Sequence, residues 1–462
     1  MKTSKPKIQK KTSLLLLTSL FLSSVSAFCQ VIPIFKEPPL KLIRKHVNQI
    51  HSSNSISGVD KADELFDKHD YTGALKIYED NSSKLDDVQQ YRLAWMYFTG
   101  KGVVKNYIKG LSISSILLDK TTNEDIKGYL SSDLGYVLGI KFILADSALS
   151  AKMFPAIINA SKKNYTHALY CLGYLYEFGP SSIKNYNQAL NYFKRASELG
   201  DPYSTMLVGS MYRDGNGVPK DINEAIKWYN KAVLQGGGFG YFGLGYLYTN
   251  DDYGIKDVSK GMDYYEKGCA LGSGTACNNI GSAYMDGKYE PKDYTKAFNA
   301  FQKGIDIGNN IAMNNMGILY YNGFGVNKDI NQAAIYFKAS AYLGYEPAIN
   351  KLADMYRKEE TSLGNIFDAV KLYQKGARLE NTYSLYFAGY IFYSWNTYNK
   401  AYGYFSKGND LGDSDCTYML GVMYQEGKGV DRNLNIATNL FQKAADKGNT
   451  KAQAKLNELN NN

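Results

Sequence analysis

The sequence has few of the residues that build catalytic and metal centres. Its 462 residues include only four histidines and five cysteines. No H-E-x-x-H, paired C-x-x-C or G-x-S-x-G motif occurs. His46 and His51 lie in a proline-containing leader, which would not hold a base or a metal ligand in a fixed geometry. These absences predict a protein that is not an enzyme and that uses no metal and no cofactor.

Clustered positive charge is also scarce. The formal net charge is +9, but five of the 53 basic residues fall within the first 27 positions, and the other 48 nearly balance the 44 acidic residues. Nucleic-acid binding draws on clustered lysine and arginine, so no nucleic-acid partner is predicted. Only ten prolines occur, and 44% of the residues are apolar. This composition favours a folded chain with a core over a disordered one.

Apolar runs long enough to cross a membrane are absent. The leucine-rich run Leu14–Leu22 is too short for a transmembrane helix. It follows five lysines and precedes the small residues Val25-Ser26-Ala27, which is typical of a secretory signal peptide over residues 1–27. We therefore predict a periplasmic or secreted bacterial protein without a transmembrane segment. Phe28 stands where lipoprotein processing requires a small residue, which argues against a lipid anchor on Cys29.

Glycine, in contrast, recurs at a fixed period of 36 residues, which indicates a repeat protein. The first series is Gly200, Gly236, Gly272, Gly308 and Gly344; Glu380 interrupts it, and it resumes after a deletion of four residues with Gly412 and Gly448. The second series is Gly173, Gly209, Gly245, Gly281 and Gly317, followed by Ala353, Gly389 and Gly421. An aromatic residue stands three positions after each member of the second series.

A third glycine pattern, G-x-G-V, could belong either to a phosphate-binding loop or to a turn. It occurs in YYNGFGVNKD (Tyr320–Asp329) and again at Gly100, Gly215 and Gly427. A phosphate-binding loop is built once per nucleotide, after a strand and before a helix. This pattern recurs after each predicted helix instead. It therefore predicts a turn between two helices, followed by an Asp or Asn that suits a helix cap.

Each unit thus predicts a helix, a glycine turn and a second helix. Ala312, Met316 and Leu319 recur at the spacing of one helical face. One such pair cannot bury its apolar face alone, so the expected fold is an all-α solenoid of 36-residue helix-turn-helix repeats. The expected boundaries are a signal peptide over 1–27, an extended leader over 28–55, degenerate helical repeats over 56–164, eight repeats over 165–448 with a shortened unit at 381–412, and a capping helix over 449–462.

The repeat resembles the Sel-one-like repeat family, which is related to tetratricopeptide repeats. Its consensus is A-x-x-x-L-G-x-x-Y-x-x-G-x-G-V-x-x-D followed by A-x-x-W-Y-x-K-A-A-x-x-G, and residues Ser204 to Gly236 match it almost throughout. The resemblance implies a right-handed superhelix that serves as a binding scaffold and has no shared catalytic centre.

Two cysteines are placed for a disulfide. Cys269 and Cys277 lie eight residues apart across the turn between two units, on helices that should bring them together, and an oxidising compartment permits the bond. The spacing resembles that of the secreted, cysteine-rich branch of the family. Two free thiols are the alternative. Cys416 stands where other units have a small residue, which predicts a buried thiol, and Cys171 has no evident partner.

One face of the first helices varies between units and is rich in tyrosine. It includes the positions three before, one after and four after the glycine of the second series. Tyrosine is common at protein interfaces, so we predict a partner-binding face there. The alternative is that these aromatic residues pack between neighbouring units. The predicted residues are Tyr170, Tyr174, Phe242, Tyr246, Tyr321, Arg357, Tyr386, Tyr390, Tyr393 and Tyr418. The shortened unit near Trp395 is a further candidate.

The predicted function is a periplasmic or secreted adaptor that binds another protein without catalysis. Three settings fit the resemblance: an immunity protein that neutralises a bacterial toxin such as a type VI lipase effector, an envelope assembly scaffold, or a factor that acts on host proteins. One alternative is a β-lactam-binding activity of the cysteine-rich branch, for which Ser181 and Lys184 form an S-x-x-K without its companion motifs. A carbohydrate-binding envelope module is the other.

Overall fold

The computed structural model describes residues 59–99, 101–103, 107–138, 147–288 and 291–460, and all regular elements in these ranges are helices. The all-α solenoid class is thereby confirmed. The predicted signal peptide and the whole predicted leader, with Cys29, His46 and His51, lie outside the described residues. None of the helices in the described ranges is both long and apolar enough to cross a membrane.

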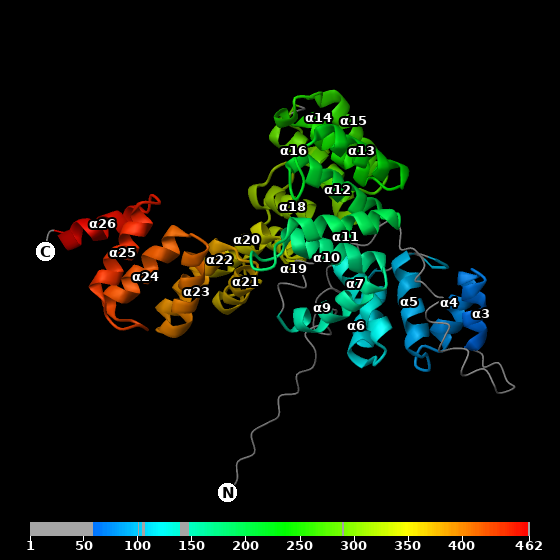
Figure 1. The fold of residues 1–462 in the computed structure, drawn as a ribbon, viewed down its shortest axis with the longest axis horizontal. Coiled ribbons are helices and arrows are strands. Elements are labelled where there is room, and N and C mark those ends of the chain that lie inside the picture. Colours follow the sequence, from blue (N-terminus) through cyan, green and yellow to red (C-terminus); the bar gives the residue numbers. More distant parts are fainter. Residues whose placement is uncertain (1–58, 100, 104–106, 139–146, 289–290, 461–462) are drawn as a thin grey trace, which may run out of the picture. The chain divides into compact units, whose positions relative to one another are not determined.

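The chain divides into two compact units, each built from consecutive pairs of packed helices (Figure 1). The first unit contains α3 (Asp60–Asp67), α4 (Tyr71–Asp80), α5 (Asp87–Thr99), α6 (Tyr107–Lys120), α7 (Glu124–Leu138), most of α9 (Ser147–Lys162), α10 (Thr166–Phe178), α11 (Tyr186–Glu198), α12 (Pro202–Asp214), α13 (Ile222–Leu234), α14 (Phe239–Thr249), the short η1 (Asp251–Tyr253), α15 (Val258–Ala270), α16 (Gly274–Asp286) and α17 (Tyr294–Asp306). The boundary falls within α18 (Asn310–Asn322). The second unit contains α19 (Ile330–Tyr342), α20 (Glu346–Arg357), α21 (Ile366–Arg378), α22 (Thr382–Ser394), α23 (Tyr398–Asp410), α24 (Ser414–Glu426), α25 (Leu434–Ala445) and α26 (Thr450–Asn460).

The second glycine series is explained by close packing within each helix pair. A Cβ atom on Gly281 would lie only 2.5 Å from the ring of Phe301, which is on the second helix of the same repeat. That distance is far inside van der Waals contact, so only glycine lets the ring lie flat on the first helix. The same pairing joins Gly173 to Phe193, Gly209 to Tyr229, Gly245 to Tyr265, Gly317 to Phe337, Gly389 to Phe405 and Gly421 to Phe441.

The first glycine series ends the second helix of each repeat. Gly200, Gly272 and Gly308 have φ angles of +84° to +87°, a left-handed conformation that closes a helix at little cost when the residue is glycine. Glu380 interrupts the series in sequence, yet it adopts the same conformation with φ +60°. The repeat geometry therefore persists where the glycine is lost.

The G-x-G-V segments are turns, as predicted. Gly215 has φ +77° and ends α12, and Asp221 then caps α13 by accepting a hydrogen bond from the backbone N–H of Glu224. The second glycine of the turn rests on the preceding repeat: a Cβ atom on Gly217 would lie 3.0 Å from the backbone of Tyr186, the first residue of α11. Gly102 lies in the same way on Tyr71, and Gly429 on Tyr398.

Helix α26 ends the second unit. Its Ala452 and Leu456 are buried in a cluster with Phe441, while most of its other described side chains are exposed to solvent. This amphipathic pattern leaves one face covering the last repeat and the other in contact with water.

Candidate partner-binding surface

The predicted partner-binding face is not uniformly accessible. Tyr170, three positions before its glycine, is only 4% exposed, because the ring of Tyr203 from the next repeat lies 5.3 Å from it. The equivalent Met206, Asn278 and Asn314 are also buried. For these four residues, the alternative of packing between repeats describes the structure. Tyr170 is therefore not part of the accessible surface.

Residues four positions after the glycine connect successive repeats. The Tyr321 hydroxyl donates to Glu360 Oε2 of the next repeat over 2.9 Å, and Lys351 Nζ lies 3.6 Å from its ring centroid. Tyr393 makes the corresponding hydrogen bond to Glu426, which also pairs with Lys428. Tyr321 and Tyr393 are therefore half-buried and link neighbouring repeats, so neither is an unengaged surface group.

Arg357 and Asp354 form a polar network that the sequence did not reveal. The hydroxyls of Tyr373 and Tyr383 donate to the two oxygens of Asp354 over 2.5 and 2.6 Å, and Arg357 Nη2 donates to Asp354 over 3.1 Å. Partial burial alone would raise the pKa of Asp354, but these three hydrogen bonds outweigh it and lower the pKa. Arg357 also lies 4.6 Å from the ring centroid of Phe387.

The contact between Tyr373 and Asp354 arises from a position that recurs in every repeat. The second-helix ring at the position of Phe193 is tyrosine in three of the eight repeats over residues 165–448, one of which has Ala353 in place of the glycine, and the tyrosine hydroxyl then needs a partner from the first helix. Tyr229 contacts Ser210 at 3.2 Å, Tyr265 contacts Thr249 at 3.1 Å, and Tyr373 donates to Asp354. The sequence signal for these pairs is the presence of tyrosine instead of phenylalanine at this position, which a comparison of the repeats would have revealed.

The aromatic residues of the face in the first unit are half-buried. Tyr174 packs on Phe178 with ring centroids 4.6 Å apart. Phe242 and Tyr246 have centroids 6.4 Å apart, and the Arg213 guanidinium lies 4.5 Å from the Tyr246 ring centroid. An arginine over the ring occupies the surface that a partner would otherwise contact.

The face is most open on α22. Tyr390 is 47% exposed, and its ring is stacked on that of Tyr386 with centroids 6.1 Å apart. Burial, followed by the nearby carboxylate of Asp415, raises the pKa of Tyr386 to about 12, so its hydroxyl stays protonated at neutral pH. Tyr418 of α24 is half-buried against Phe441 and is close enough to Tyr386 to interact with it electrostatically. Tyr386, Tyr390 and Tyr418 are called the tyrosine face below.

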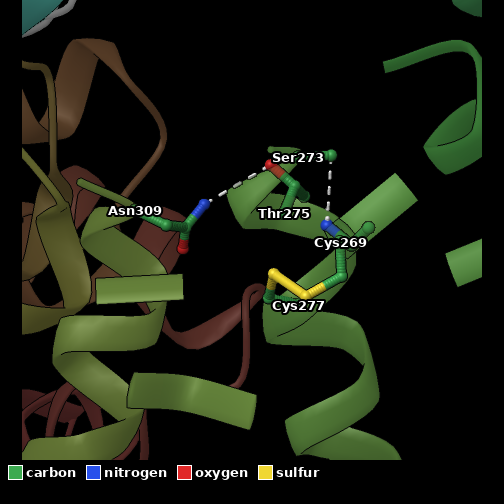
Figure 2. The surroundings of a disulfide bond; sticks show 6 residues. Cys269, Ser273, Thr275, Cys277 and Asn309 are labelled. Carbon is green, nitrogen blue, oxygen red and sulfur yellow. Dashed lines mark hydrogen bonds between the residues drawn. A yellow bond between two sulfur atoms is a disulfide. The ribbon is translucent and has the colours of Figure 1, made fainter. Parts of the chain in front are cut away.

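Cys269 of α15 and Cys277 of α16 are joined by a disulfide bond, with their Cα atoms 4.8 Å apart (Figure 2). The bond ties the second helix of one repeat to the first helix of the next. Beside it, Asn309 Nδ2 donates to Thr275 Oγ1 over 3.4 Å and links the same turn to a third repeat. Cys171 and Cys416 are buried and form no disulfide, and burial raises the pKa of each thiol, which makes both poor nucleophiles.

Replacing both Cys269 and Cys277 with alanine is expected to lower the free energy of unfolding by about 2–3 kcal/mol, since the closed loop is short. Urea denaturation of the oxidised proteins measures the difference. A reductant should destabilise the wild type by the same amount and leave the double variant unchanged. Equal stability of the oxidised wild type and the variant would contradict a stabilising disulfide.

The described residues contain no group of three or more His, Cys, Asp or Glu side chains that could hold a metal ion. Ser181 and Lys184 lie in the turn between α10 and α11, and the Lys184 ammonium lies 4.8 Å from the ring centroid of Tyr186. His167 is buried and contacts Asp133 at 2.7 Å.

Several known proteins are similar to this chain. A curated relative, the rat DAP3-binding cell death enhancer 1, is 44% identical over 62 residues, which are 13% of this chain and only 12% of that protein. Among solved structures, the protective antigen c5321 of uropathogenic Escherichia coli, described as displaying an SLR fold, is 23% identical over 83% of this chain and 82% of its own, with a TM-score of 0.44. A Sel1 repeat protein from Oxalobacter formigenes is 23% identical over 69% of this chain and 94% of its own, with a TM-score of 0.46.

The immunity protein Pa5087 of Pseudomonas aeruginosa is 17% identical over 49% of this chain and 84% of its own, with a TM-score of 0.36. The model of the Sel1 repeat family matches residues 90–112, 166–201, 202–237, 239–273, 274–309, 310–345, 347–381, 384–413 and 414–449. These nine segments make up more than half of the chain, which therefore belongs to the Sel1 repeat family, a family of protein-interaction scaffolds.

Proposed function

We propose that this chain is an adaptor outside the cytoplasm that binds another protein through the tyrosine face of α22 and α24. The observation that carries the proposal is the exposure of Tyr390: nearly half of this large side chain is in contact with solvent, on a helix whose other exposed tyrosine, Tyr383, is tied to Asp354. Tyrosine offers a large contact area and a hydroxyl at low entropic cost, which suits the centre of an interface.

Contrast with other tyrosines in the chain supports this choice. Many of them have a lysine over the ring or a carboxylate at the hydroxyl; Tyr248, for example, accepts a hydrogen bond from Lys260 Nζ, which lies 4.1 Å from its ring centroid. In the described part of the chain, Tyr386 and Tyr390 have ring neighbours but no hydrogen bond to either hydroxyl and no cation over either ring. Both hydroxyls are therefore available to a partner.

The secreted or periplasmic location rests on two features of the chain. The first is the signal-peptide pattern of residues 1–27, and the second is the disulfide between Cys269 and Cys277, because disulfides persist in oxidising compartments. Of the three settings considered for the partner, neutralisation of a toxin makes the sharpest prediction, since it requires one tight, stoichiometric protein complex.

The proposal is tested by cross-linking the mature chain in its native envelope fraction, purifying it, and identifying the captured proteins by mass spectrometry. We expect one dominant protein, and its recovery should fall at least about tenfold when Tyr386 and Tyr390 are both changed to alanine. A tenfold loss corresponds to about 1.4 kcal/mol, which is modest for two aromatic residues at the centre of an interface.

A matched variant with Tyr212 and Tyr248 changed to alanine removes two tyrosines whose hydroxyls accept from Lys194 and Lys260, respectively, and it should retain the partner. Retention of the same partner by the Tyr386/Tyr390 variant would show that the scaffold binds elsewhere. Capture of no protein by the wild type, with retention on peptidoglycan or polysaccharide, would replace the adaptor with the carbohydrate-binding alternative.

A further inference from the structure

Two aromatic residues stand at surface positions that are small, polar or glycine in the other repeats. Phe367 is the second residue of α21 and is 65% exposed. Among the eight repeats over residues 165–448, the second residue of the corresponding helix in the other seven is Asn187, Asn223, Ser259, Thr295, Asn331, Asn399 or Asn435. Within these eight repeats, only this one has an exposed phenylalanine at a position that otherwise carries a small polar side chain.

Trp395 shows the same departure one repeat later. It directly follows α22 and is 40% exposed. The residue that follows the first helix of the other repeats is Gly179, Gly215, Asn250, Gly287, Gly323, Lys358 or Gly427. Trp395 therefore takes the place of a turn residue, in the repeat that lost four residues from its turn.

Phe367 and Trp395 contact each other. The rings of Phe367 and Trp395 lie with centroids 5.5 Å apart and planes tilted by 37°. Trp395 also packs edge-on against the buried Phe392, with centroids 5.9 Å apart. Phe367 and Trp395 thus form one exposed aromatic patch that rests on the core of the second unit. We call this pair the aromatic seat.

The missing turn explains why the seat is open. In complete repeats the second glycine of the turn rests on the first residue of the second helix of the preceding repeat, as Gly217 does on Tyr186 and Gly429 on Tyr398. The turn of the repeat over residues 347–381 likewise contacts the preceding repeat, where Thr361 Oγ1 donates to Asn331 Oδ1 over 2.7 Å. Helix α22 is joined to α23 by Trp395–Thr397 alone, so no such turn covers the start of α21.

Several polar side chains close to the seat in sequence already have partners. Asn365 caps α21 by accepting from the backbone N–H groups of Phe367 and Asp368, and Asn396 Oδ1 accepts from the Tyr398 hydroxyl over 2.6 Å. Lys371 pairs with Asp368 at 2.9 Å. A sugar would need unengaged polar groups around the rings, and a charged ligand would need an unpaired opposite charge. The surroundings instead favour an uncharged, apolar protein segment.

We propose that the aromatic seat binds a turn of a partner protein that carries an apolar side chain, in the place that complete repeats cover with their own glycine turn. The seat shares no residue with the tyrosine face, and this inference does not depend on the function proposed for that face. A partner that presents a glycine turn would restore the backbone contact of a complete repeat and would cover both rings.

Fluorine NMR of the full mature chain labelled with 5-fluorotryptophan tests the proposal. The chain has three tryptophans, Trp95, Trp228 and Trp395. The probe is the peptide YYNGFGVNKD, which reproduces residues 320–329 and contains a glycine turn with a phenylalanine. We expect the Trp395 resonance, assigned with Trp395→Phe, to shift saturably with peptide at concentrations up to about 5 mM. The Trp95 and Trp228 resonances should not move.

Phe367→Asn restores the side chain of the other repeats and should abolish the shift, while circular dichroism verifies the fold. Phe178→Asn, which removes an exposed phenylalanine of α10, should leave the shift intact. An unchanged Trp395 resonance at the highest peptide concentration, or an equal shift with a scrambled peptide, would overturn the proposal. A Trp395 resonance that moves on dilution of the protein alone would also overturn it, because the seat would then be covered by a second copy of the chain.

Discussion

Changing Asp133 to asparagine should lower the free energy of unfolding of the first unit by about 3–5 kcal/mol, the cost of breaking a buried charged network. Asp133 of α7 is only 1% exposed. Its Oδ2 accepts from the Tyr91 hydroxyl of α5 over 2.9 Å, and its Oδ1 accepts from the Tyr165 hydroxyl over 2.5 Å. His167 Nδ1 lies 2.7 Å from Oδ1 and must donate to it, because a carboxylate only accepts.

The asparagine would keep one acceptor oxygen but replace the other with an amide donor, so one of the donating groups would lose its acceptor, and the network would lose the negative charge to which the hydroxyls and His167 donate. Burial, followed by the charge of Asp133, raises the pKa of both Tyr91 and Tyr165 well above the usual value, so neither hydroxyl can lose its proton to relieve the conflict. The expected result is local unfolding of α5, α7 and α10, measured by urea denaturation and by hydrogen exchange of these helices.

Asp125 on the same helix provides the matched control. It pairs with Lys163 at the surface, where both side chains are about one-third exposed. Asp125→Asn should therefore cost at most about 1 kcal/mol. Equal effects of the two substitutions would show that the Asp133 network does not hold the helices together.

Changing Glu177 to glutamine should stabilise the protein at pH 8 and leave it unchanged below about pH 4.5. Glu177 near the end of α10 is 4% exposed, and its Oε2 accepts no hydrogen bond from any described residue. Burial, and next the nearby Asp214 carboxylate, raise the pKa of Glu177 to about 7, although Arg213, Lys184 and Asn216 oppose the shift. The folded state therefore binds this proton more tightly than the unfolded state, whose pKa is near 4.5.

The direction of the change in stability follows from the difference between the folded and unfolded pKa values of Glu177. As pH rises from 4.5 to 7, ionisation of Glu177 costs the folded state free energy that the unfolded state does not lose, and above pH 7 the cost is constant. This pKa difference corresponds to a loss of about 3 kcal/mol at most in the free energy of unfolding of the wild type. The stability of Glu177→Gln minus that of the wild type, from urea denaturation between pH 4 and pH 8.5, should rise over this interval and then level off.

The exposed Glu198 of α11 is the control for the loss of a surface carboxylate. Glu198→Gln should shift stability by less than about 0.5 kcal/mol at every pH. A flat difference for Glu177→Gln across the same range would mean that its carboxyl group is better solvated than its burial implies.

Local features of the chain were predictable from sequence. The 36-residue period, the helix pairs and the glycine turns depend on contacts within a repeat or between neighbours, such as Gly281 beneath Phe301. The pairing of Cys269 with Cys277 is equally local, because only a short turn separates the two helices. Such contacts leave a periodic trace in the sequence, since every repeat must satisfy the same geometry.

The tertiary structure decided which residues of one predicted face are accessible. Tyr170 and Tyr386 occupy equivalent positions, yet Tyr203 of the next repeat covers the first, whereas the second lies beside the exposed Tyr390. Burial at such a position depends on the volume of side chains in the adjoining repeat, which the pattern of a single repeat does not encode. The Asp133 network joins helices of a region without a clear period, so only the fold brings Tyr91, Tyr165 and His167 to one carboxylate.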